Sequence, residues 1–290
     1  MKGPSVLIEP KTVVWIAGAS GRLGQAIEKK LDRERYFIIP TDTDVDICDL
    51  ATVTEHAATY RPEFIINCAA MSSKAQAEEN PDEAYRVNAL GARNLAIAAN
   101  DSGAPLVHFS TDDLFPGVIP HKLNEFDKTL PPHVYGKSKE AGERLVRELC
   151  PRHIIVRSSW VYTAADGDLL HRAFEKCAAG QQIEVPTNQY GSPTSADTLA
   201  DFMIAAMEAD EFGTFHAACT GLCNRYEFVK RALELAGLPT QNLVGKQDPE
   251  EAYRIELDNL MMRLTGVFEM PSWQDDLAAF AAAHPAAFNH

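Results

Sequence analysis

The feature that most constrains this chain is a glycine-rich turn between a short apolar run and an amphipathic segment. Residues 12–17 (TVVWIA) are apolar and rich in β-branched side chains, which predicts a buried strand. The turn at residues 18–24 has the spacing G-x-x-G-x-x-G, and a helix is expected over residues 22–32. Glycines let the backbone approach a ligand closely, and a helix N-terminus offers free N–H groups to a phosphate. A strand, this turn and a helix in that order indicate a dinucleotide-binding site.

Strands and helices alternate through the first half of the chain. Apolar runs predict strands at residues 36–39, 64–67, 106–109 and 154–156, and helices are expected over residues 50–60, 81–100 and 134–149. One helix has a clear start, with Asn80 as its cap, Pro81 in its first position and Glu83 as a capping-box carboxylate. The alternation predicts an α/β fold with a doubly wound parallel sheet, the Rossmann fold.

Beyond Trp160 the pattern is less regular. Helices are expected over residues 169–179, 196–207, 226–236 and 273–283, with a strand-like stretch at 214–218. No internal repeat or low-complexity linker separates this part from the first. We therefore expect residues 1–160 to form a dinucleotide-binding Rossmann domain. Residues 161–290 are expected to form mainly a smaller substrate-binding lobe, interleaved with the sheet.

Charge and hydropathy limit the kinds of partner and the cellular compartment expected for this chain. The 290 residues carry a formal net charge of −14, which would repel phosphate backbones and argues against nucleic-acid binding. Residues 1–6 do not resemble a signal peptide, and there is no apolar run of about 18 residues that would span a membrane. The six cysteines form no C-x-x-C pair. These features predict reduced thiols and a cytoplasmic protein.

One cluster of metal-binding residue types lies close together in the sequence and consists of His216, Cys219 and Cys223. A zinc site would need a fourth ligand at a rigid spacing, and none is apparent. We expect these side chains to be buried beside a strand, and we predict no metal.

An acidic segment follows the second predicted strand. Asp42 lies 18 residues after Gly24, where a carboxylate would accept hydrogen bonds from the adenine-ribose hydroxyls and repel a 2′-phosphate. Asp44 and Asp46 compete with it for this role, and a solvated acidic loop is an alternative interpretation. The expected cofactor is NADH or NADPH, and Asp42 favours NADH.

Tyr135 and Lys139 stand four residues apart on a predicted helix and therefore share one face. A lysine ammonium beside a phenol would stabilise the phenolate and lower the pKa of the tyrosine. Such a pair can donate a proton to a carbonyl oxygen while hydride arrives from a nicotinamide. Tyrosine and lysine at this spacing are common by chance, so the assignment depends on the neighbouring segments.

Two neighbouring segments support this assignment. Ser110-Thr111-Asp112 follows the fourth predicted strand, at the edge of the sheet where doubly wound folds bind ligands, and Thr111 could hold a substrate oxygen there. Asn88 falls on the apolar stripe of its helix, where an amide is costly to bury unless it is paired. A structural hydrogen bond and a role in a proton relay are both open for Asn88.

Six segments occur in an order and spacing that resembles the extended short-chain dehydrogenases/reductases: GASGRLG, INCAA, VNALGARNL, HFSTD, YGKSK and RSSWVY. Within that group, VDICD, AEENPDEAYRVNA, QYGSPTSADTLA and GTFHAA resemble the dTDP-4-dehydrorhamnose reductase family. The glycine and Y-x-x-x-K motifs are common to the superfamily, whereas QYGSPT is the narrower signal. The resemblance extends over about residues 12–283.

The resemblance implies a set of site residues, to which we add the residue-based candidates Gly24, Asp46 and Asn88. The catalytic residues would be Thr111, Tyr135 and Lys139. Lys139 would also hold the nicotinamide ribose, and Tyr135 would also contact the cofactor. The cofactor would contact Gly18, Ser20, Gly21, Arg22, Leu23, Gly24, Asp42, Asp46, Cys68, Ala69, Ala70 and Asn88. The substrate would contact Asp112, Asp113, Trp160, Gly191, Ser192 and Pro193.

The chain departs from the family pattern at several positions. Asp113 stands where the family usually has an aromatic residue, a change that would alter the sugar pocket. Arg254-Ile255 stands in place of an Arg-Pro pair, and Asp42 stands where these reductases often carry a less acidic residue. Ala26 replaces a carboxylate through which some members bind magnesium, so no metal is expected.

The resemblance implies NAD(P)H-dependent reduction of a 4-keto group on a nucleotide-activated deoxysugar. One alternative is another sugar-nucleotide enzyme, a dehydratase or epimerase, because Thr111-Asp112-Asp113 resembles the Thr-Asp-Glu of dehydratases. A second is a non-catalytic NAD(P)-binding regulatory subunit resembling the β subunit of methionine adenosyltransferase. The expected partner is a nucleotide-sugar substrate. A homodimer is a candidate assembly, because this superfamily often dimerises through helices.

Overall fold

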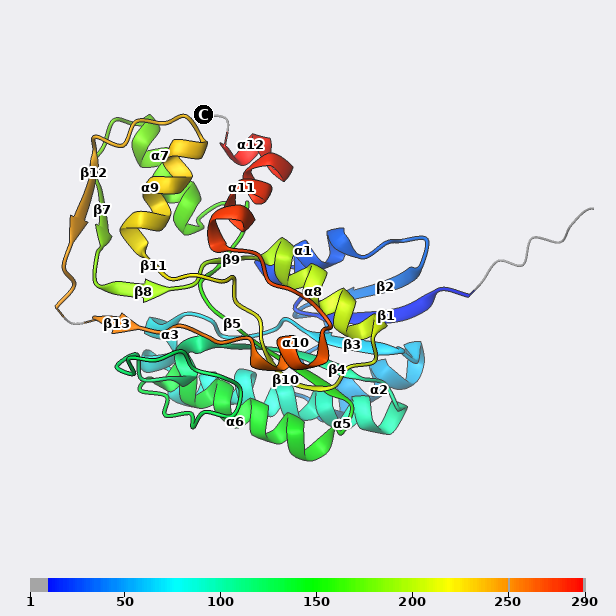
Figure 1. The fold of residues 1–290 in the computed structure, drawn as a ribbon. Coiled ribbons are helices and arrows are strands. Elements are labelled where there is room, and N and C mark those ends of the chain that lie inside the picture. Colours follow the sequence, from blue (N-terminus) through cyan, green and yellow to red (C-terminus); the bar gives the residue numbers. More distant parts are fainter. Residues whose placement is uncertain (1–9, 250, 289–290) are drawn as a thin grey trace, which may run out of the picture.

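Six parallel strands pair in the order β10-β5-β4-β3-β1-β2 and form the centre of the fold (Figure 1). The computed structural model describes residues 10–249 and 251–288. The strands of this sheet are β1 (Thr12–Ala17), β2 (Tyr36–Thr41), β3 (Phe64–Asn67), β4 (Leu106–Thr111), β5 (His153–Ser158) and β10 (Gly213–His216). The predicted doubly wound α/β sheet is confirmed. Residues 1–6, for which no signal peptide was expected, lie outside the described residues.

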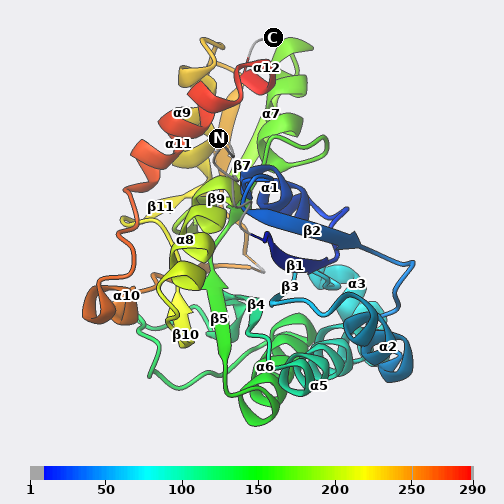
Figure 2. The ribbon, with the colours of Figure 1, turned by 90° about the vertical axis from the view of Figure 1, so that its right-hand side faces the viewer.

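Helices cover both faces of the sheet, which explains why its strands are nearly continuous apolar runs. In β1, Trp15 and Ala17 point into one core cluster, whereas Val14 and Ile16 point into the other. The first face is covered by α2 (Leu50–Tyr60), α5 (Ala92–Ser102) and α6 (Val134–Leu149), and the second by α1 (Arg22–Lys30) and α8 (Ala196–Glu208) (Figure 2). The sheet is therefore buried between two helical layers.

The strand β2 runs further than expected. We predicted its end at Pro40, but Pro40 pairs in register with Ile16, and Thr41 pairs with Ala17. Proline is tolerated here because β2 is an edge strand and the side chain of Pro40 is exposed. The strand thereby carries Asp42 to the end of the sheet beside the glycine-rich turn.

The helix predicted over residues 81–100 is interrupted. It comprises α4 (Pro81–Tyr85), a π-helical turn η1 (Arg86–Gly91) and α5. Pro81 occupies the first turn as predicted, but Asn80 does not cap the helix with its side chain, and Glu83 pairs with Arg86 instead of closing a capping box. A short helix that was not predicted, α3 (Lys74–Glu79), precedes it and is capped by Ser73.

The second half of the chain contributes both to the sheet and to a smaller lobe. The strand β10 extends the main sheet next to β5, and α8 packs against α1. The lobe contains α7 (Leu169–Ala178), α9 (Arg225–Leu235), α11 (Trp273–Ala283) and α12 (Pro285–Phe288), while α10 (Leu260–Thr265) packs against β10. One hydrophobic cluster runs from Val14 and Ile16 in the sheet to Phe174 and Phe280 in the lobe.

The lobe also contains short strands that the sequence patterns did not reveal. They are β6 (Val161–Tyr162), β7 (Ile183–Pro186), β8 (Gln189–Gly191), β9 (Thr194–Ser195), β11 (Cys223–Asn224), β12 (Leu243–Lys246) and β13 (Tyr253–Arg254). All six cysteines lie in the described part of the chain and are free thiols. Among the described helices, none is both long and apolar enough to cross a membrane.

Candidate active site

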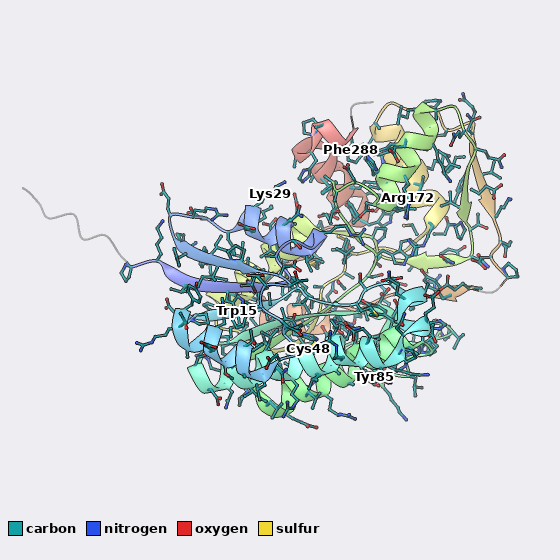
Figure 3. All side chains as sticks on the ribbon, turned by 180° about the vertical axis from the view of Figure 1, so that it is seen from behind. Trp15, Lys29, Cys48, Tyr85, Arg172 and Phe288 are labelled. Atoms are coloured by element: carbon teal, nitrogen blue, oxygen red, sulfur yellow. The ribbon has the colours of Figure 1, made fainter. Side chains whose placement is uncertain are left out.

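Two cavities meet at the carboxyl ends of β1 and β3. The larger, of about 570 Å³, is bounded by the glycine-rich turn, the loop after β2 and η1. The smaller, of about 230 Å³, extends toward α6 and includes Tyr135 and Lys139. They share four lining residues, Gly21, Cys68, Ala69 and Ala70. A ligand in both would lie across the end of the sheet where doubly wound folds bind dinucleotides. Cys48, which lines the larger cavity, lies on the sheet side of the molecule, away from Arg172 and Phe288 in the lobe (Figure 3).

The glycines of the turn have different structural roles. Gly18 has a φ of +77°, and a Cβ there would lie 2.5 Å from the backbone nitrogen of Ala69. A Cβ at Gly24 would lie 2.4 Å from the carbonyl oxygen of Gly18, so both positions are required for packing. A Cβ at Gly21 would have only that oxygen nearby, at 3.2 Å, and would otherwise enter open space. Gly21 lines both cavities, whereas Gly24 is buried and lines neither.

The turn is suited to a dinucleotide. No side chain caps α1, so its first-turn N–H groups are left for a ligand such as a pyrophosphate. Ser20 donates from its backbone N–H to Oδ2 of Asp42 at 3.2 Å, and its hydroxyl donates to the same oxygen. Asp42 therefore holds the turn and also lines the larger cavity. The larger cavity could hold the adenosine half of such a cofactor, and the smaller cavity could hold its nicotinamide half.

The other charges around the larger cavity are Asp46, Glu83 and Arg86. Arg86 donates to Glu83 at 2.6 Å and to Asp46 at 3.3 Å. The Cys48 N–H and Arg86 lower the pKa of Asp46, while burial raises the pKa of the Cys48 thiol to about 11. The thiol is therefore neutral, and the cavity wall is predominantly anionic.

Tyr135 and Lys139 are brought together on the wall of the smaller cavity, as predicted. The Lys139 ammonium donates to the carbonyl oxygen of Phe109 at 2.6 Å. Burial lowers the pKa of Lys139 to about 8, although the nearby Glu143 opposes the shift. Arg22 and Leu23 line the opposite side, and Arg22 is paired with Asp168 of the lobe at 3.2 Å.

The expected lowering of the pKa of Tyr135 is wrong for this structure. Burial raises the pKa of the phenol, the charges of Asp113 and Asp112 raise it further, and only the hydroxyl of Thr111 opposes them. The Lys139 ammonium is directed at the Phe109 carbonyl, 2.6 Å away. Tyr135 is therefore a neutral phenol at neutral pH, which is the form that donates a proton.

Thr111 is the last residue of β4, and Asp112 and Asp113 form the turn that follows it. The Thr111 hydroxyl accepts from the N–H of Asp113 at 3.1 Å and caps the short helix η2 (Asp112–Leu114). Asp112 is 6% exposed, and its Oδ2 accepts from the Ser159 hydroxyl at 2.7 Å. Burial, followed by the charge of Asp113, raises the pKa of Asp112 to about 6. A buried carboxylate with an accessible pKa is typical of a functional site.

Two further contacts involve the other residues predicted to contact substrate. The N–H of Ser192 donates to the Ser159 hydroxyl at 3.4 Å, which links it to Asp112. Trp160 has a φ of +43° and lies over Gly191, where a Cβ would come within 2.5 Å of the indole. Pro193 is buried between Ser192 and Thr194.

The structure does not place Asn88 where it was expected, at the cofactor site. It lies on η1, is 1% exposed and borders neither cavity. Its side-chain oxygen accepts from the N–H of Met71 at 2.9 Å, and its amide donates to the Met71 carbonyl at 3.1 Å and to the Ser138 hydroxyl at 2.9 Å. These contacts favour the structural alternative, in which Asn88 ties the loop after β3 to α6.

Several residues near the site were not predicted. Tyr253 accepts from Trp160 Nε1 and from Arg225, each at 3.1 Å, and the Arg225 guanidinium lies 4.1 Å from the centroid of the Trp160 ring system. Lys74 forms an ion pair with Asp113 at 2.6 Å. The motif RSSWVY contains Ser159 and was a signal for that residue, whereas Lys74, Arg225 and Tyr253 have no comparable signal.

The His216, Cys219 and Cys223 cluster is buried next to β10 and β11. The Nδ1 atom of His216 contacts the Leu123 carbonyl at 2.9 Å, and Nε2 contacts Arg157 at 3.3 Å. Burial and the Arg157 charge lower the pKa of His216 to about 3. In the part of the chain that the structure describes, no three His, Cys, Asp or Glu side chains are arranged to hold a metal.

Known proteins resemble this chain in sequence and in fold. The family model of the RmlD substrate binding domain matches residues 12–285. The dTDP-4-dehydrorhamnose reductase of Mycobacterium tuberculosis (strain H37Rv) is 34% identical over 281 residues, 92% of each chain. The spore coat polysaccharide biosynthesis protein SpsK of Bacillus subtilis is 33% identical over 251 residues, covering 84% of this chain and 88% of SpsK.

Among solved structures, the dTDP-4-dehydrorhamnose reductase of Bacillus anthracis in complex with NADP has a TM-score of 0.90 and 35% identity. The match covers 94% of this chain and 99% of that one. The resemblance inferred from the motifs is thereby confirmed over nearly the whole chain. The chain belongs to the RmlD substrate binding domain family, the group of extended short-chain dehydrogenases/reductases that includes the dTDP-4-dehydrorhamnose reductases.

Proposed function

We propose that this protein is an NAD(P)H-dependent oxidoreductase that reduces a 4-keto group on a nucleotide-activated deoxysugar, most specifically dTDP-4-dehydrorhamnose. The observation that carries the proposal is the groove itself. A dinucleotide-sized space begins at the glycine-rich turn and ends at Tyr135 and Lys139, beside the Thr111-Asp112 turn. Relatives whose names state this reaction are 31% and 34% identical over 78% and 92% of this chain.

The chain supplies the proton and the orientation of the substrate. The reduced nicotinamide, when bound, supplies hydride to the carbonyl carbon. Tyr135 would donate its proton to the carbonyl oxygen, a step for which its raised pKa keeps it protonated at neutral pH. The Thr111 hydroxyl would orient that oxygen, and Lys139 would hold the nicotinamide ribose. Tyrosinate formed in the reaction regains a proton from solvent before the next turnover.

The cofactor is proposed to be NADH. Asp42, Asp46 and Glu83 place three carboxylates around the larger cavity, and Arg86 is already engaged by two of them. A 2′-phosphate would therefore meet net negative charge. The homologous Bacillus anthracis enzyme was solved with NADP, so the two cofactors have to be compared directly on this chain.

Absorbance at 340 nm with dTDP-4-dehydrorhamnose and either NADH or NADPH tests this proposal. We expect substrate-dependent oxidation at about one to tens of turnovers per second, with NADH preferred. Asp42→Asn keeps the shape of the side chain and should improve the Kd of NADPH by about tenfold while weakening NADH. The exposed Asp101→Asn is the matched control and should change neither Kd. Oxidation with NADPH alone would contradict the cofactor assignment.

The same assay separates the alternatives. A dehydratase or epimerase would convert the sugar without net oxidation of the cofactor. In this structure Asp113 is paired with Lys74, which does not favour a free acid at that position. A regulatory subunit would bind the cofactor, show no turnover with any ketosugar nucleotide, and be recovered with a stoichiometric partner protein.

A further inference from the structure

Lys74 joins three elements of the fold near the proposed active site. It is the first residue of α3, and its ammonium lies 2.6 Å from Oδ1 of Asp113 in η2. It also lies 3.7 Å from Glu251 and 5.4 Å from the ring centroid of Tyr253, both on or next to β13. The side chains of Lys74 and Asp113 are 33% and 19% exposed, so water screens this pair only in part.

Asp113 lies against the helix that carries Tyr135. A Cβ at Gly136, the residue after Tyr135, would lie 2.2 Å from the carbonyl oxygen of Asp113. The N–H of Asp113 is also held by the hydroxyl of Thr111 at 3.1 Å. The backbone that carries the Asp113 carboxylate is therefore fixed between the residue that would orient the substrate and the residue that would donate the proton.

We propose that Lys74 is a positioning residue: its ammonium holds the Asp113 carboxylate and neutralises it next to the proton donor Tyr135. The inference rests on the proposed reductase function and adds a residue to it. Nothing in the sequence motifs points to Lys74, which becomes visible only when α3 and η2 are seen together. Asp113 alone occupies the position where the family usually has an aromatic residue, so its charge is a departure from the family pattern.

After burial, the charge of Asp113 is the largest cause of the raised pKa of Tyr135. Burial lowers the pKa of Lys74, but Asp113, Tyr253 and Glu251 together outweigh it and the net shift is upward, so Lys74 stays charged. Lys74 also lowers the pKa of Asp112 against burial and Asp113. Removing the ammonium would leave two carboxylates uncompensated beside the phenol.

Other charged groups also surround the start of α6. Glu78 on α3 accepts from the N–H of Val134 at 2.8 Å and lies 3.8 Å from His133, while Lys139 is one turn further along α6. These groups have partners that do not include Asp113. Of the carboxylates that Lys74 pairs with, Asp113 at 2.6 Å is nearer than Glu251 at 3.7 Å.

The test is the alkaline limb of the pH dependence of kcat. Activity is lost as the pH rises through the pKa of the proton donor, because the phenolate cannot donate. Lys74→Met should move this limb upward by about one pH unit and Asp113→Asn should move it downward by a similar amount. The double variant Lys74→Met/Asp113→Asn should return close to the wild-type limb, and Lys74→Arg should retain the wild-type limb.

A matched control and a second readout distinguish the possible failures. Lys30 and Asp201 form an ion pair at 2.9 Å with similar exposure of the lysine, and Lys30→Met should leave the limb in place. The second readout is the ¹³Cζ resonance of Tyr135, identified by its absence in Tyr135→Phe, in enzyme loaded with NAD⁺. Its titration midpoint should order as Asp113→Asn below wild type below Lys74→Met.

The order of the Tyr135 titration midpoints can be measured by NMR even if the protein reduces no ketosugar. If the order holds without turnover, the proposed function fails and the role of Lys74 stands. If the wild type turns over but Lys74→Met lowers kcat with neither a limb shift nor a midpoint shift, Lys74 is only structural and the inference is overturned.

Discussion

Asp112 is a carboxylate that the folded protein holds at a cost. Its pKa is raised from the ordinary 3.8 to about 6, first by burial and then by the charge of Asp113. The folded state therefore binds this proton more tightly than the unfolded chain does. The cost is absent below about pH 4, appears as the pH rises toward 6, and is complete above that, at about 3 kcal/mol.

Asp112→Asn should remove this cost, since the amide oxygen can still accept from Ser159. We expect the variant to be more stable than wild type by about 2–3 kcal/mol at pH 8 and nearly equal to it at pH 4. Urea unfolding at the two pH values measures the difference. An equal gain at both would mean that ionisation of Asp112 is not the source of the cost.

Tyr135 is expected to act in the chemical step and not in binding. Tyr135→Phe removes the proton donor from the wall of the smaller cavity while keeping the ring. Turnover should fall by about 10²–10⁴-fold, and the Kd of the nicotinamide cofactor should stay within about twofold. Fluorescence titration beside steady-state kinetics checks both. A cofactor affinity that fell together with kcat would assign Tyr135 to binding.

Among the elements, the glycine-rich turn contains one glycine needed for packing, Gly24, and one that borders the space for a ligand, Gly21. Gly24→Ala places a Cβ 2.4 Å from the Gly18 carbonyl and 2.8 Å from Ala19, so it should lower stability by about 1–3 kcal/mol. Gly21→Ala leaves a methyl group at the junction of the two cavities and should weaken cofactor binding at least about tenfold with a smaller change in Tm. Thermal unfolding and cofactor titration of both variants make the comparison; interchanged effects would contradict it.

Elements of the main sheet could be predicted because strands buried on both faces are visible as apolar runs. The bounds of β1 and β3 matched the expectation, and β4 and β5 differed only at their ends. The strands β8, β11 and β13 could not be predicted, because each is only two or three residues long. Each also pairs with a segment distant in sequence, as Tyr190 does with Asn224 and Arg254. The π-helical turn likewise leaves the apolar pattern of its helix almost unchanged.

The residues of the candidate site are likewise of two kinds: some belong to sequence motifs, and others are brought together only by the fold. Gly18, Tyr135 and Lys139 belong to motifs in which spacing along one element carries the signal, and the structure places them around one groove. Lys74 and Asp113 are 39 residues apart, and a lysine on a short helix looks like any solvated charge until the helix is placed. The raised pKa of Tyr135 comes first from burial and then from carboxylates that only the folded chain brings close.

At the scale of the whole molecule, we propose that the lobe and the sheet unfold together. Asp276 in α11 is 2% exposed and accepts from Tyr162, from both the N–H and the hydroxyl of Ser195, and from Thr198. These donors lie on β6, β9 and α8, and α8 also covers the sheet with α1. The carboxylate thus connects the last long helix of the lobe to α8, which packs against α1 on the sheet.

Asp276→Ala should therefore destabilise the whole chain by about 3 kcal/mol, because several buried donors lose their acceptor. Unfolding followed by Trp15 alone and by Trp273 alone, with the other tryptophans replaced by phenylalanine, should shift by the same amount. The exposed Gln274→Ala in the same helix is the control. Separate transitions for the two probes would show that the lobe is an independent domain.

We infer that this chain transfers hydride to the carbonyl carbon of a nucleotide-bound ketosugar, with Tyr135 as the proton donor. Incubation with dTDP-4-dehydrorhamnose and nicotinamide cofactor deuterated at C4 tests it most directly, with the sugar nucleotide examined by mass spectrometry and NMR. We predict one deuterium at C4 of the sugar, one oxidised cofactor per product, and neither in the same period with Tyr135→Phe. A sugar converted without deuterium, or a cofactor recovered fully reduced, would contradict the account.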